Sequence, residues 1–268
     1  GAINTHVGYE VECGNDVEII ECNAFNNSVG VWIGNTTGTR IAGGTYKNNG
    51  NAILPSDYTT IDGAYLANSN NATYPANIFA YGVKEVIVKD CIIEQTALTT
   101  IAYNIYLQDC QKFVIDGNVV KNSYNTSAIC LLDAIDCIIS NNYIYDDRST
   151  VETIFGIHVL GDANRTTIYE NVIENITTTA IYIQKGDFMD VVNNQITGAC
   201  YGISLESSVN STIMGNKIVD TTDYDIVLSN NVDNTYIAMN HVNKIHLDHL
   251  TSSCDYNYIF GNYVNDLS

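Results

Sequence analysis

Short apolar patches recur along the whole chain in a polar background rich in Asn, Ser and Thr. The segment YGISLESSVNSTIMGNKIVD, residues 201–220, is representative, with one patch at 203–205 and another at 213–218. Neither patch has the length or the period of about 3.6 residues that an amphipathic helix requires. Alternating apolar residues over three to five positions predict short β-strands, and the Asn, Ser and Gly residues between them favour turns.

One pattern, Ile-x-x-Asn-x-Φ with Φ apolar, repeats with intervals of mostly 21 to 24 residues. A stacked repeat has this kind of fixed period. Degenerate copies open the series at Ile20/Asn23/Phe25, Ile41/Gly44/Tyr46, Thr60/Gly63/Tyr65 and Ile87/Asp90/Ile92. Clear copies follow at Ile115/Asn118/Val120, Ile139/Asn142/Ile144, Ile168/Asn171/Ile173, Val191/Asn194/Ile196, Ile213/Asn216/Ile218, Ile237/Asn240/Val242 and Ile259/Asn262/Val264.

A second pattern, a small or polar residue followed by Φ-x-Φ, precedes many of these copies. Two patterns in a constant order at one period are poorly explained by chance. Its copies span Gly30–Ile33, Asn104–Leu107, Ala128–Leu131, Gly156–Val159, Ala180–Ile183, Gly202–Leu205 and Asp225–Leu228.

Both patterns describe strands that cannot bury their apolar side chains within one repeat. Stacked repeats can bury them, because parallel strands then pair with the coils above and below, about 4.8 Å away. The sequence therefore predicts an all-β fold, a single-stranded right-handed parallel β-helix of about 11 coils with 21–29 residues each. We expect one domain, 1–268, without clear caps. A hydrogen-bonded ladder along the stack is predicted for Asn118, Asn142, Asn171, Asn194, Asn216, Asn240 and Asn262.

Charge limits the partners of this chain, which has 30 acidic and 11 basic residues and a net charge of −19. Nucleic acid is excluded as a partner, because phosphate neutralisation needs clustered Lys and Arg. No stretch reaches the roughly 18 apolar residues of a membrane span, so membrane insertion is not expected. An acidic polysaccharide would need a bridging cation such as Ca²⁺, and no other cofactor is predicted.

The repeats resemble those of right-handed parallel β-helix proteins of the pectin-lyase-like and NosD-like type, over nearly the whole chain. The resemblance implies the fold and leaves the function open, because lyases, hydrolases, epimerases, adhesins and structural proteins share it. It also implies that a catalytic site would lie on an outer sheet face, beside the Φ-x-Φ strands. The motifs N-T-D, H-G, R-x-K and D-P-H of enzymes in this family are missing from the expected places, and Asp146-Asp147 is the only D-D pair. Their absence argues against an enzyme. Longer coils predict outward loops at 64–77, 93–102, 121–127 and 145–154.

A catalytic constellation can still be assembled from the outward residues of the Φ-x-Φ strands. His158 and Tyr182 should lie one ladder step apart, with Asp133, Asp162, Lys185 and Glu206 just beyond these strands. Such a set could perform acid–base chemistry on a glycan; an ordinary solvated sheet face is the alternative. The candidate catalytic residues are His158, Tyr182, Asp162 and Glu206.

Aromatic residues on the same face could instead form a platform on which sugars stack, because their flat faces are amphipathic. The candidates for stacking are Trp32, Tyr106 and Tyr182. A separate cluster, His246-Leu247-Asp248-His249, places His246 and Asp248 on one strand face. A third ligand is not evident there, so no metal site is predicted.

The two ends of the predicted solenoid lack the capping segments that usually protect terminal coils. Either the chain is a fragment of a longer protein, or its last coil stacks on the first coil of another subunit. Cys13 and Cys22 in the first coil and Cys254 in the last are candidates for a disulfide at such a contact. Buried or unrelated thiols are the alternative for all eight cysteines.

These observations lead to one functional prediction and one alternative. The first is an extracellular structural protein that associates with copies of itself, head to tail, into a fibre, sheath or surface layer, loosely resembling β-helical surface and sheath proteins of archaea. The alternative is a carbohydrate-active β-helix enzyme, a polysaccharide lyase or glycoside hydrolase, or a glycan-binding domain. For either, the expected location is outside the cell or at its surface, and the partners are copies of the chain or a polysaccharide.

Overall fold

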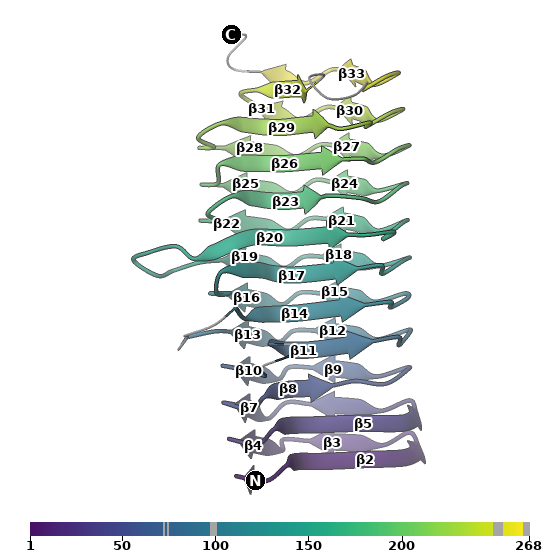
Figure 1. The fold of residues 1–268 in the computed structure, drawn as a ribbon, viewed down its shortest axis with the longest axis vertical. Coiled ribbons are helices and arrows are strands. Elements are labelled where there is room, and N and C mark those ends of the chain that lie inside the picture. Colours follow the sequence, from purple (N-terminus) through teal and green to yellow (C-terminus); the bar gives the residue numbers. More distant parts are fainter. Residues whose placement is uncertain (72, 74, 97–100, 249–253, 265–268) are drawn as a thin grey trace.

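The computed structural model describes residues 1–268 apart from 72, 74, 97–100, 249–253 and 265–268. Its strands wind into a parallel β-helix of about 11 coils, with the N-terminus at one end of the stack and the C-terminus at the other (Figure 1). The predicted fold class is therefore confirmed. The described part of the chain contains no helix long and apolar enough to cross a membrane.

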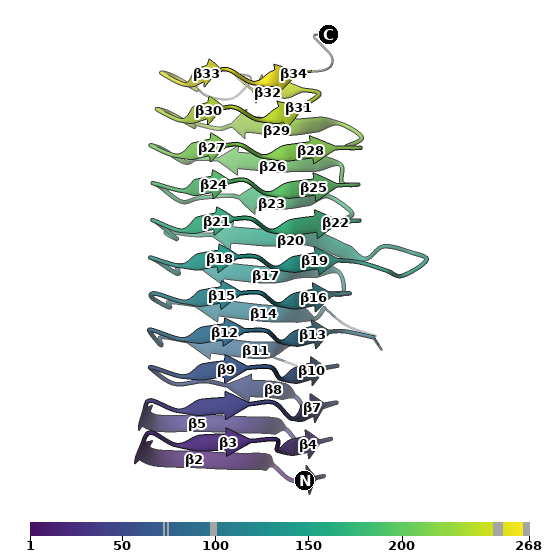
Figure 2. The ribbon, with the colours of Figure 1, turned by 180° about the vertical axis from the view of Figure 1, so that it is seen from behind.

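Sheet A runs the whole length of the solenoid and carries the strands that follow the repeated Asn (Figure 2). All its pairs are parallel. Its twelve strands are β1 (Ala2–Ile3), β4 (Asn23–Phe25), β7 (Thr45–Lys47), β10 (Tyr65–Ala67), β13 (Ile92–Glu94), β16 (Val119–Lys121), β19 (Tyr143–Tyr145), β22 (Val172–Glu174), β25 (Gln195–Thr197), β28 (Lys217–Val219), β31 (His241–Val242) and β34 (Tyr263–Val264).

Sheet B lies at the front of Figure 1 and contains the longest strands, including those of the Φ-x-Φ pattern. Its eleven strands are β2 (Val7–Asn15), β5 (Val29–Thr37), β8 (Asn51–Leu54), β11 (Ala76–Tyr81), β14 (Tyr103–Gln108), β17 (Thr126–Leu132), β20 (Thr153–Leu160), β23 (Thr179–Ile183), β26 (Tyr201–Glu206), β29 (Tyr224–Ser229) and β32 (Ile245–Asp248).

Sheet C connects the other two and begins each Ile-x-x-Asn repeat. Its eleven strands are β3 (Glu18–Ile20), β6 (Arg40–Ala42), β9 (Thr60–Asp62), β12 (Ile87–Lys89), β15 (Val114–Asp116), β18 (Ile138–Ser140), β21 (Thr167–Tyr169), β24 (Asp190–Val192), β27 (Thr212–Met214), β30 (Tyr236–Ala238) and β33 (Tyr258–Phe260). Each three-residue strand of sheet C turns its central residue into the solenoid, as Ile115 and Ile139 do at 0% exposure.

The predicted asparagine positions form a continuous buried ladder between sheets C and A. Each Asn side chain accepts from the backbone N–H and the Nδ2 of the preceding Asn, with N···O distances of 2.9–3.1 Å from Asn118 to Asn262. Each Nδ2 also donates to a backbone carbonyl, as Asn194 does to Ile168 at 2.9 Å. The ladder therefore satisfies polar backbone groups that would otherwise be buried without partners.

Three of the four degenerate copies of the repeat are wrong by one residue. The register pairs Ile19 with Ile41 and Val88 with Ile61, so the core residues are Ile19, Ile61 and Val88 rather than their neighbours. The ladder position of the fourth coil is Cys91, whose N–H donates to the Asn118 side chain at 3.0 Å. Adjacent apolar residues at these sites made both registers plausible from sequence, whereas burial selects one. The shortest coil between described strand partners, from Ile226 to Ile245, has 19 residues, fewer than the predicted minimum of 21.

The predicted loop at 145–154 projects farther from the stack than the other described loops (Figures 1 and 2). Its base is fixed by the Asp146 side chain, which is 1% exposed and accepts from Thr153 N, Thr153 Oγ1 and Arg148 Nε at 2.9–3.0 Å. These donors lower the pKa of Asp146 to about 2, against the opposing effect of burial. Positions 72, 74 and 97–100 of the predicted loops 64–77 and 93–102 lie outside the described residues.

Candidate functional site

A groove of about 390 Å³ lies on the outer face of sheet B, over the strands from β20 to β32. Nearly all its lining residues are half-buried, and Thr179 alone among them is buried. The groove is lined by Phe155, Thr178, Thr179, Tyr182, Tyr201, Ser204, Glu206, Tyr224, Val227, Ser229, His246 and Asp248. It combines aromatic faces, hydroxyl groups and two carboxylates.

A row of side chains, set by the parallel register, runs along the floor of the groove. In this row Phe155 pairs with Thr179, Thr179 with Tyr201, and Tyr201 with Tyr224. The Tyr201 and Tyr224 rings have centroids 6.4 Å apart and an interplanar angle of 21°, and the Tyr224 ring stacks on His246 at 4.4 Å and 11°. Because these three rings stack on one another, the faces of Tyr224 are directed at Tyr201 and His246, and its edge is turned to the groove. The other neighbour of Tyr201 in this row is Thr179, which has no ring.

The carboxylate of Glu206 is held in place by two donors from neighbouring coils. Tyr182 donates its hydroxyl to Glu206 Oε2, and Asn230 Nδ2 donates to Oε1 at 2.8 Å. Burial, and then the hydrogen bond and charge of Glu206, raise the pKa of Tyr182 far above its usual value. Tyr182 is therefore a neutral hydrogen-bond donor at neutral pH.

His158 was predicted to act with Tyr182, and its ring does stack on Tyr182, with centroids 5.0 Å apart and an angle of 16°. The Phe155 ring lies 4.4 Å from the imidazole, and His158 is not among the residues that line the groove. Burial lowers the pKa of His158 to about 4, so the imidazole is neutral at neutral pH. Its Nδ1 lies 3.3 Å from Ser127 Oγ, and its buried Nε2 has no hydrogen-bond partner among the described residues. His158 supports the floor rather than facing a ligand.

Asp162, the fourth catalytic candidate, does not join the others. Its carboxylate is 73% exposed and pairs with Lys185 Nζ at 2.5 Å. Both residues line a different hollow, at the turn between sheets B and C. The structure thus brings His158, Tyr182 and Glu206 together and leaves Asp162 apart.

The three stacking candidates occupy different parts of sheet B. Tyr182 lies in the groove, Tyr106 packs against Phe79 and Tyr103 at 5.7 and 4.9 Å, and Trp32 lies on β5 near the N-terminal end, 36% exposed. Each strand turns two successive residues inward, such as Gly202 and Ile203. In β20, β26 and β29 the residue three places before the Φ-x-Φ centre therefore also faces outward, which strict alternation does not predict. A search at that offset would have found the missed groove residues Phe155, Tyr201 and Tyr224.

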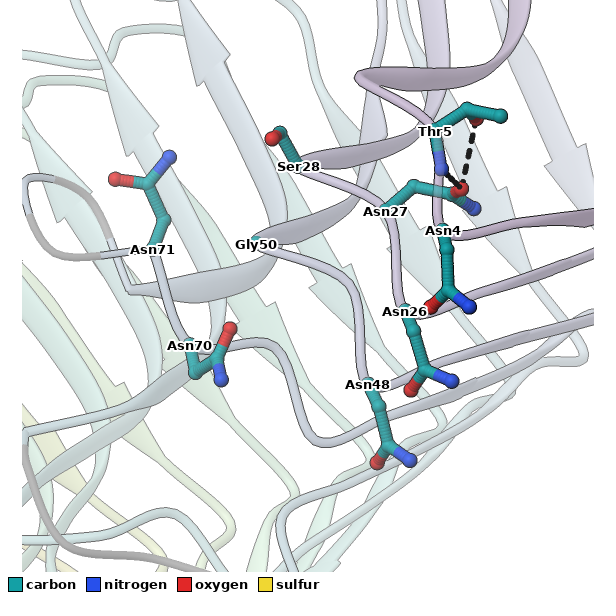
Figure 3. A pocket seen from close by; sticks show the side chains of 9 residues that line it. All are labelled: Asn4, Thr5, Asn26, Asn27, Ser28, Asn48, Gly50, Asn70 and Asn71. Carbon is teal, nitrogen blue, oxygen red and sulfur yellow. Dashed lines mark hydrogen bonds between the residues drawn. The ribbon is translucent and has the colours of Figure 1, made fainter.

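A second, larger hollow of about 590 Å³ lies at the turns between sheets A and B in the first coils (Figure 3). Asn4, Asn26 and Asn48 adopt left-handed φ angles of 56–57° at equivalent turn positions, and their amides project side by side. Asn27 lies beneath them, and its Oδ1 accepts from Thr5 N and Oγ1 at 2.8 Å. This hollow has no titratable or aromatic lining group, and its asparagines are accounted for by the turns, since Asn tolerates this conformation.

Residues 57–267 match the family model of the periplasmic copper-binding protein NosD. No curated protein matches the sequence significantly. The predicted resemblance to NosD-like β-helix proteins is confirmed.

Solved structures with the same fold cover nearly the whole chain at low identity. The Dettilon tailspike protein gp208 is 16% identical with a TM-score of 0.62, over 91% of this chain and 61% of the tailspike chain. DFA-IIIase from Arthrobacter chlorophenolicus A6 in complex with GF2 is 12% identical with a TM-score of 0.65, over 96% and 71%. PfbA, a surface adhesin of Streptococcus pneumoniae, is 12% identical with a TM-score of 0.61, over 95% and 72%. At these identities the likeness establishes the fold alone.

The described residues do not fit a copper centre. Copper sites combine imidazole with thiolate or thioether ligands, yet no group of three or more His, Cys, Asp or Glu able to hold a metal occurs in the described part of the chain. His246 and Asp248 share β32, whereas His249 of the same predicted cluster lies outside the described residues. Burial raises the pKa of the Cys91 and Cys130 thiols to about 12, which disfavours the thiolate that a metal needs.

Proposed function

The chain belongs to the NosD family of β-helix proteins, and from its aromatic groove we propose that it is an exported glycan-binding protein. The single observation that carries the proposal is the aromatic groove on sheet B, where the rings of Phe155 and Tyr201 lie on either side of the small Thr179, beside polar groups. A sugar ring places its apolar face on an aromatic ring and directs its hydroxyl groups to polar neighbours. Glu206, Ser204, Ser229 and the threonines at the edge would accept and donate those hydrogen bonds.

An export location is supported by the family itself, which is that of a periplasmic protein, and by the structural neighbour PfbA, which is a surface adhesin. Binding is favoured over catalysis because the proposed acid–base set is incomplete around the groove. His158 is neutral beneath Phe155, and Asp162 faces another hollow.

The fibre hypothesis receives no support from the comparisons or from the contacts of the described residues, and the carbohydrate alternative fits better. All eight cysteines are free thiols. Cys13 is exposed, Cys22 is half-buried, and Cys254 is buried with its Sγ 3.6 Å from the Asp248 carbonyl oxygen. Cys254 would have to leave this position to reach a thiol in another subunit.

Affinity electrophoresis through native gels that contain neutral or charged polysaccharides tests the proposal. We expect at least one polysaccharide to retard the wild-type protein. The double substitution Tyr201→Ala and Tyr224→Ala should weaken that interaction about tenfold or more, because the Tyr201 contact with the sugar and the Tyr224 ring that stacks on Tyr201 are both lost, at about 0.5–1.5 kcal/mol each.

A matched control is available on sheet C, where Tyr236 and Tyr258 also stack, with centroids 4.9 Å apart and an angle of 12°. Replacing both by alanine removes the same side chains from a different face. The proposal fails if no polysaccharide retards the protein, or if the sheet C variant loses as much binding as the groove variant.

A further inference from the structure

Two tyrosines and two small hydroxyl residues alternate on neighbouring strands in the middle of the groove. On β23, Thr179 lies three residues before Tyr182. On β26, Tyr201 lies three residues before Ser204. The register pairs Thr179 with Tyr201 and Tyr182 with Ser204, and all four residues line the groove. Each ring therefore has a small residue beside it on the neighbouring strand.

The Tyr182 ring is covered on one side only. His158 stacks on it with centroids 5.0 Å apart, and the Phe155 ring lies 5.3 Å away. Both of these rings belong to β20, on one side of Tyr182. On the other side, towards β26, the paired residue is Ser204, which has no ring. The Tyr182 face above Ser204 is therefore open to a ligand.

The floor next to this face is accessible and uncharged. Ser204 and its partner Val227 on β29 are both half-buried, whereas Thr179 is only 4% exposed. The Ser204 hydroxyl makes no hydrogen bond within the described part of the chain, although a hydroxyl can donate one bond and accept others. A ligand above Ser204 meets an aromatic face, a hydroxyl group and an apolar side chain.

The space above this floor is long enough for a sugar. The row continues from Tyr182 through Ser204 and Val227 to His246, so its two rings are three strand steps, about 14 Å, apart. A sugar ring in contact with the Tyr182 face needs a separation of only about 3.5–4.0 Å from it. One sugar residue thus fits between Tyr182 and His246 with its face against the tyrosine.

The charges around this floor disfavour an anionic ligand. Glu206 lies two residues after Ser204, and its carboxylate is held by Tyr182 through Oε2 and by Asn230 through Oε1. No lysine or arginine is among the described residues that line the groove. The net charge of −19 also repels polyanions on approach. A carboxylate or sulfate group of a ligand would find a like charge here and no opposite one.

We propose that the groove binds neutral glycans and holds one uncharged sugar residue above Ser204 and Val227, with its apolar face on Tyr182. This inference rests on the proposed function, since it names the class of glycan and its position in the same site. The C–H groups of the sugar pack on the tyrosine ring and on Val227. Its hydroxyl groups bond to Ser204 and donate to the carboxylate of Glu206.

Isothermal titration calorimetry with matched pairs of hexasaccharides tests the glycan class. Each pair consists of cellohexaose, maltohexaose or mannohexaose and the same chain with its primary hydroxyl groups oxidised to carboxylates. We expect at least one neutral hexasaccharide to bind, and its oxidised counterpart to bind at least tenfold more weakly. Added salt should change the affinity for the neutral chain less than twofold and should reduce the difference, because screening weakens repulsion between charges.

Substitutions at Ser204 test the position of the sugar. Ser204→Phe fills the space beside Tyr182 without removing an aromatic side chain, and should weaken binding at least tenfold. The fold should accept the ring, because Tyr224 in the neighbouring row already lies between two rings. Ser204→Ala keeps the space and removes one hydrogen bond, so it should weaken binding about threefold. Thr212→Phe adds the same ring on sheet C, beside Tyr236, and should not change binding.

The outcomes separate this inference from the proposed function. Equal or tighter binding of the oxidised hexasaccharides, or retardation in the gels by charged polysaccharides alone, overturns the neutral class and leaves glycan binding intact. A folded Ser204→Phe variant that binds a hexasaccharide, or is retarded by a neutral polysaccharide, as strongly as the wild type overturns the position. The matched pairs use the wild-type protein, so they test the inference whether or not the variant folds. Binding of no hexasaccharide, together with no retardation by any polysaccharide, rejects the proposed function itself.

Discussion

Removal of one interior asparagine from the ladder should destabilise the protein far more than removal of the terminal one. Asn194 is 0% exposed, and its Nδ2 donates to Ile168 O, Val192 O and Asn216 Oδ1 at 2.9, 3.2 and 3.0 Å. Its Oδ1 accepts from the N–H and the Nδ2 of Asn171, both at 3.0 Å. Asn194→Ala removes all five bonds in one substitution.

The magnitude follows from which groups lose their last partner. A net loss of about 0.5–1.5 kcal/mol per bond, and about 1–3 kcal/mol for a buried donor such as Asn171 N–H left unpaired, suggests about 3–5 kcal/mol in total. Asn262 ends the ladder, is half-buried and makes fewer bonds. Water can replace its partners, so Asn262→Ala should cost about 1 kcal/mol.

Equilibrium urea unfolding followed by far-UV circular dichroism measures both free energies. Asn194→Asp is an informative third variant, because it keeps the shape but turns a donor to two backbone carbonyls into a buried acceptor. It should be at least as destabilising as alanine at neutral pH. A cost of Asn194→Ala below about 1 kcal/mol, or one equal to that of Asn262→Ala, would refute the ladder as a source of stability.

Three predictions concern protonation. The pKa of His158 is about 4 in the folded protein and lies near 6.5 when unfolded. Its contribution to stability is therefore present above pH 6.5 and lost as the pH falls through 4. His158→Phe should flatten the dependence of stability on pH between these values, as measured by thermal unfolding at a series of pH values. The pKa of Asp146 is about 2 in the folded protein, against an ordinary value of 3.8. Its contribution to stability is therefore present above pH 4 and lost as the pH falls towards 2. Asp146→Asn should lower the free energy of unfolding by about 2–4 kcal/mol at neutral pH and remove the loss of stability between pH 4 and 2. The hydrogen bond from Tyr143 to Glu174, with burial, raises the pKa of Tyr143 to about 12, so its contribution to stability is present below pH 10 and lost as the pH rises through 12. Tyr65 also has a pKa raised to about 12, so Tyr143→Phe should reduce the tyrosinate absorbance step near pH 12 without abolishing it; loss of absorbance near pH 10 instead would contradict the contact.

The fold could be predicted from sequence because equivalent interior positions require the same types of residue in every coil. An inward position in sheet C accepts Ile or Val, as at Ile115, Ile139 and Val191, and the ladder position accepts Asn wherever it must pair in both directions. Where a coil lacks the repeated Asn, the register predicted from the sequence is less certain to be correct. The first coils use Gly44, Ala64 and Cys91 at the ladder position, and without the Asn the neighbouring apolar residues cannot fix the register.

The groove was harder to predict because no interior constraint selects its residues. The outward face of sheet B tolerates Tyr, Phe, Thr or Ser at equivalent positions, so its chemistry changes from coil to coil without a repeating signal. Tyr182 was found because it is the central, outward residue of a Φ-x-Φ strand, and Glu206 because it lies just beyond one. Tyr201 and Tyr224 were missed because two successive inward residues separate each of them from the centre of the Φ-x-Φ pattern.

The groove lies on the outer face of sheet B, where packing in the interior does not determine the residue type. Parallel pairing places residues of successive coils about 4.8 Å apart, so a ladder of outward rings forms as soon as neighbouring coils carry aromatics at one position. The loop at 145–154 enters sheet B through β20, at the coil where the groove begins with Phe155. From Phe155 to His246 the floor then extends along the solenoid axis, which suits an extended chain better than a compact ligand. A repeat that stabilises the fold in every coil thereby also supplies an elongated outer surface.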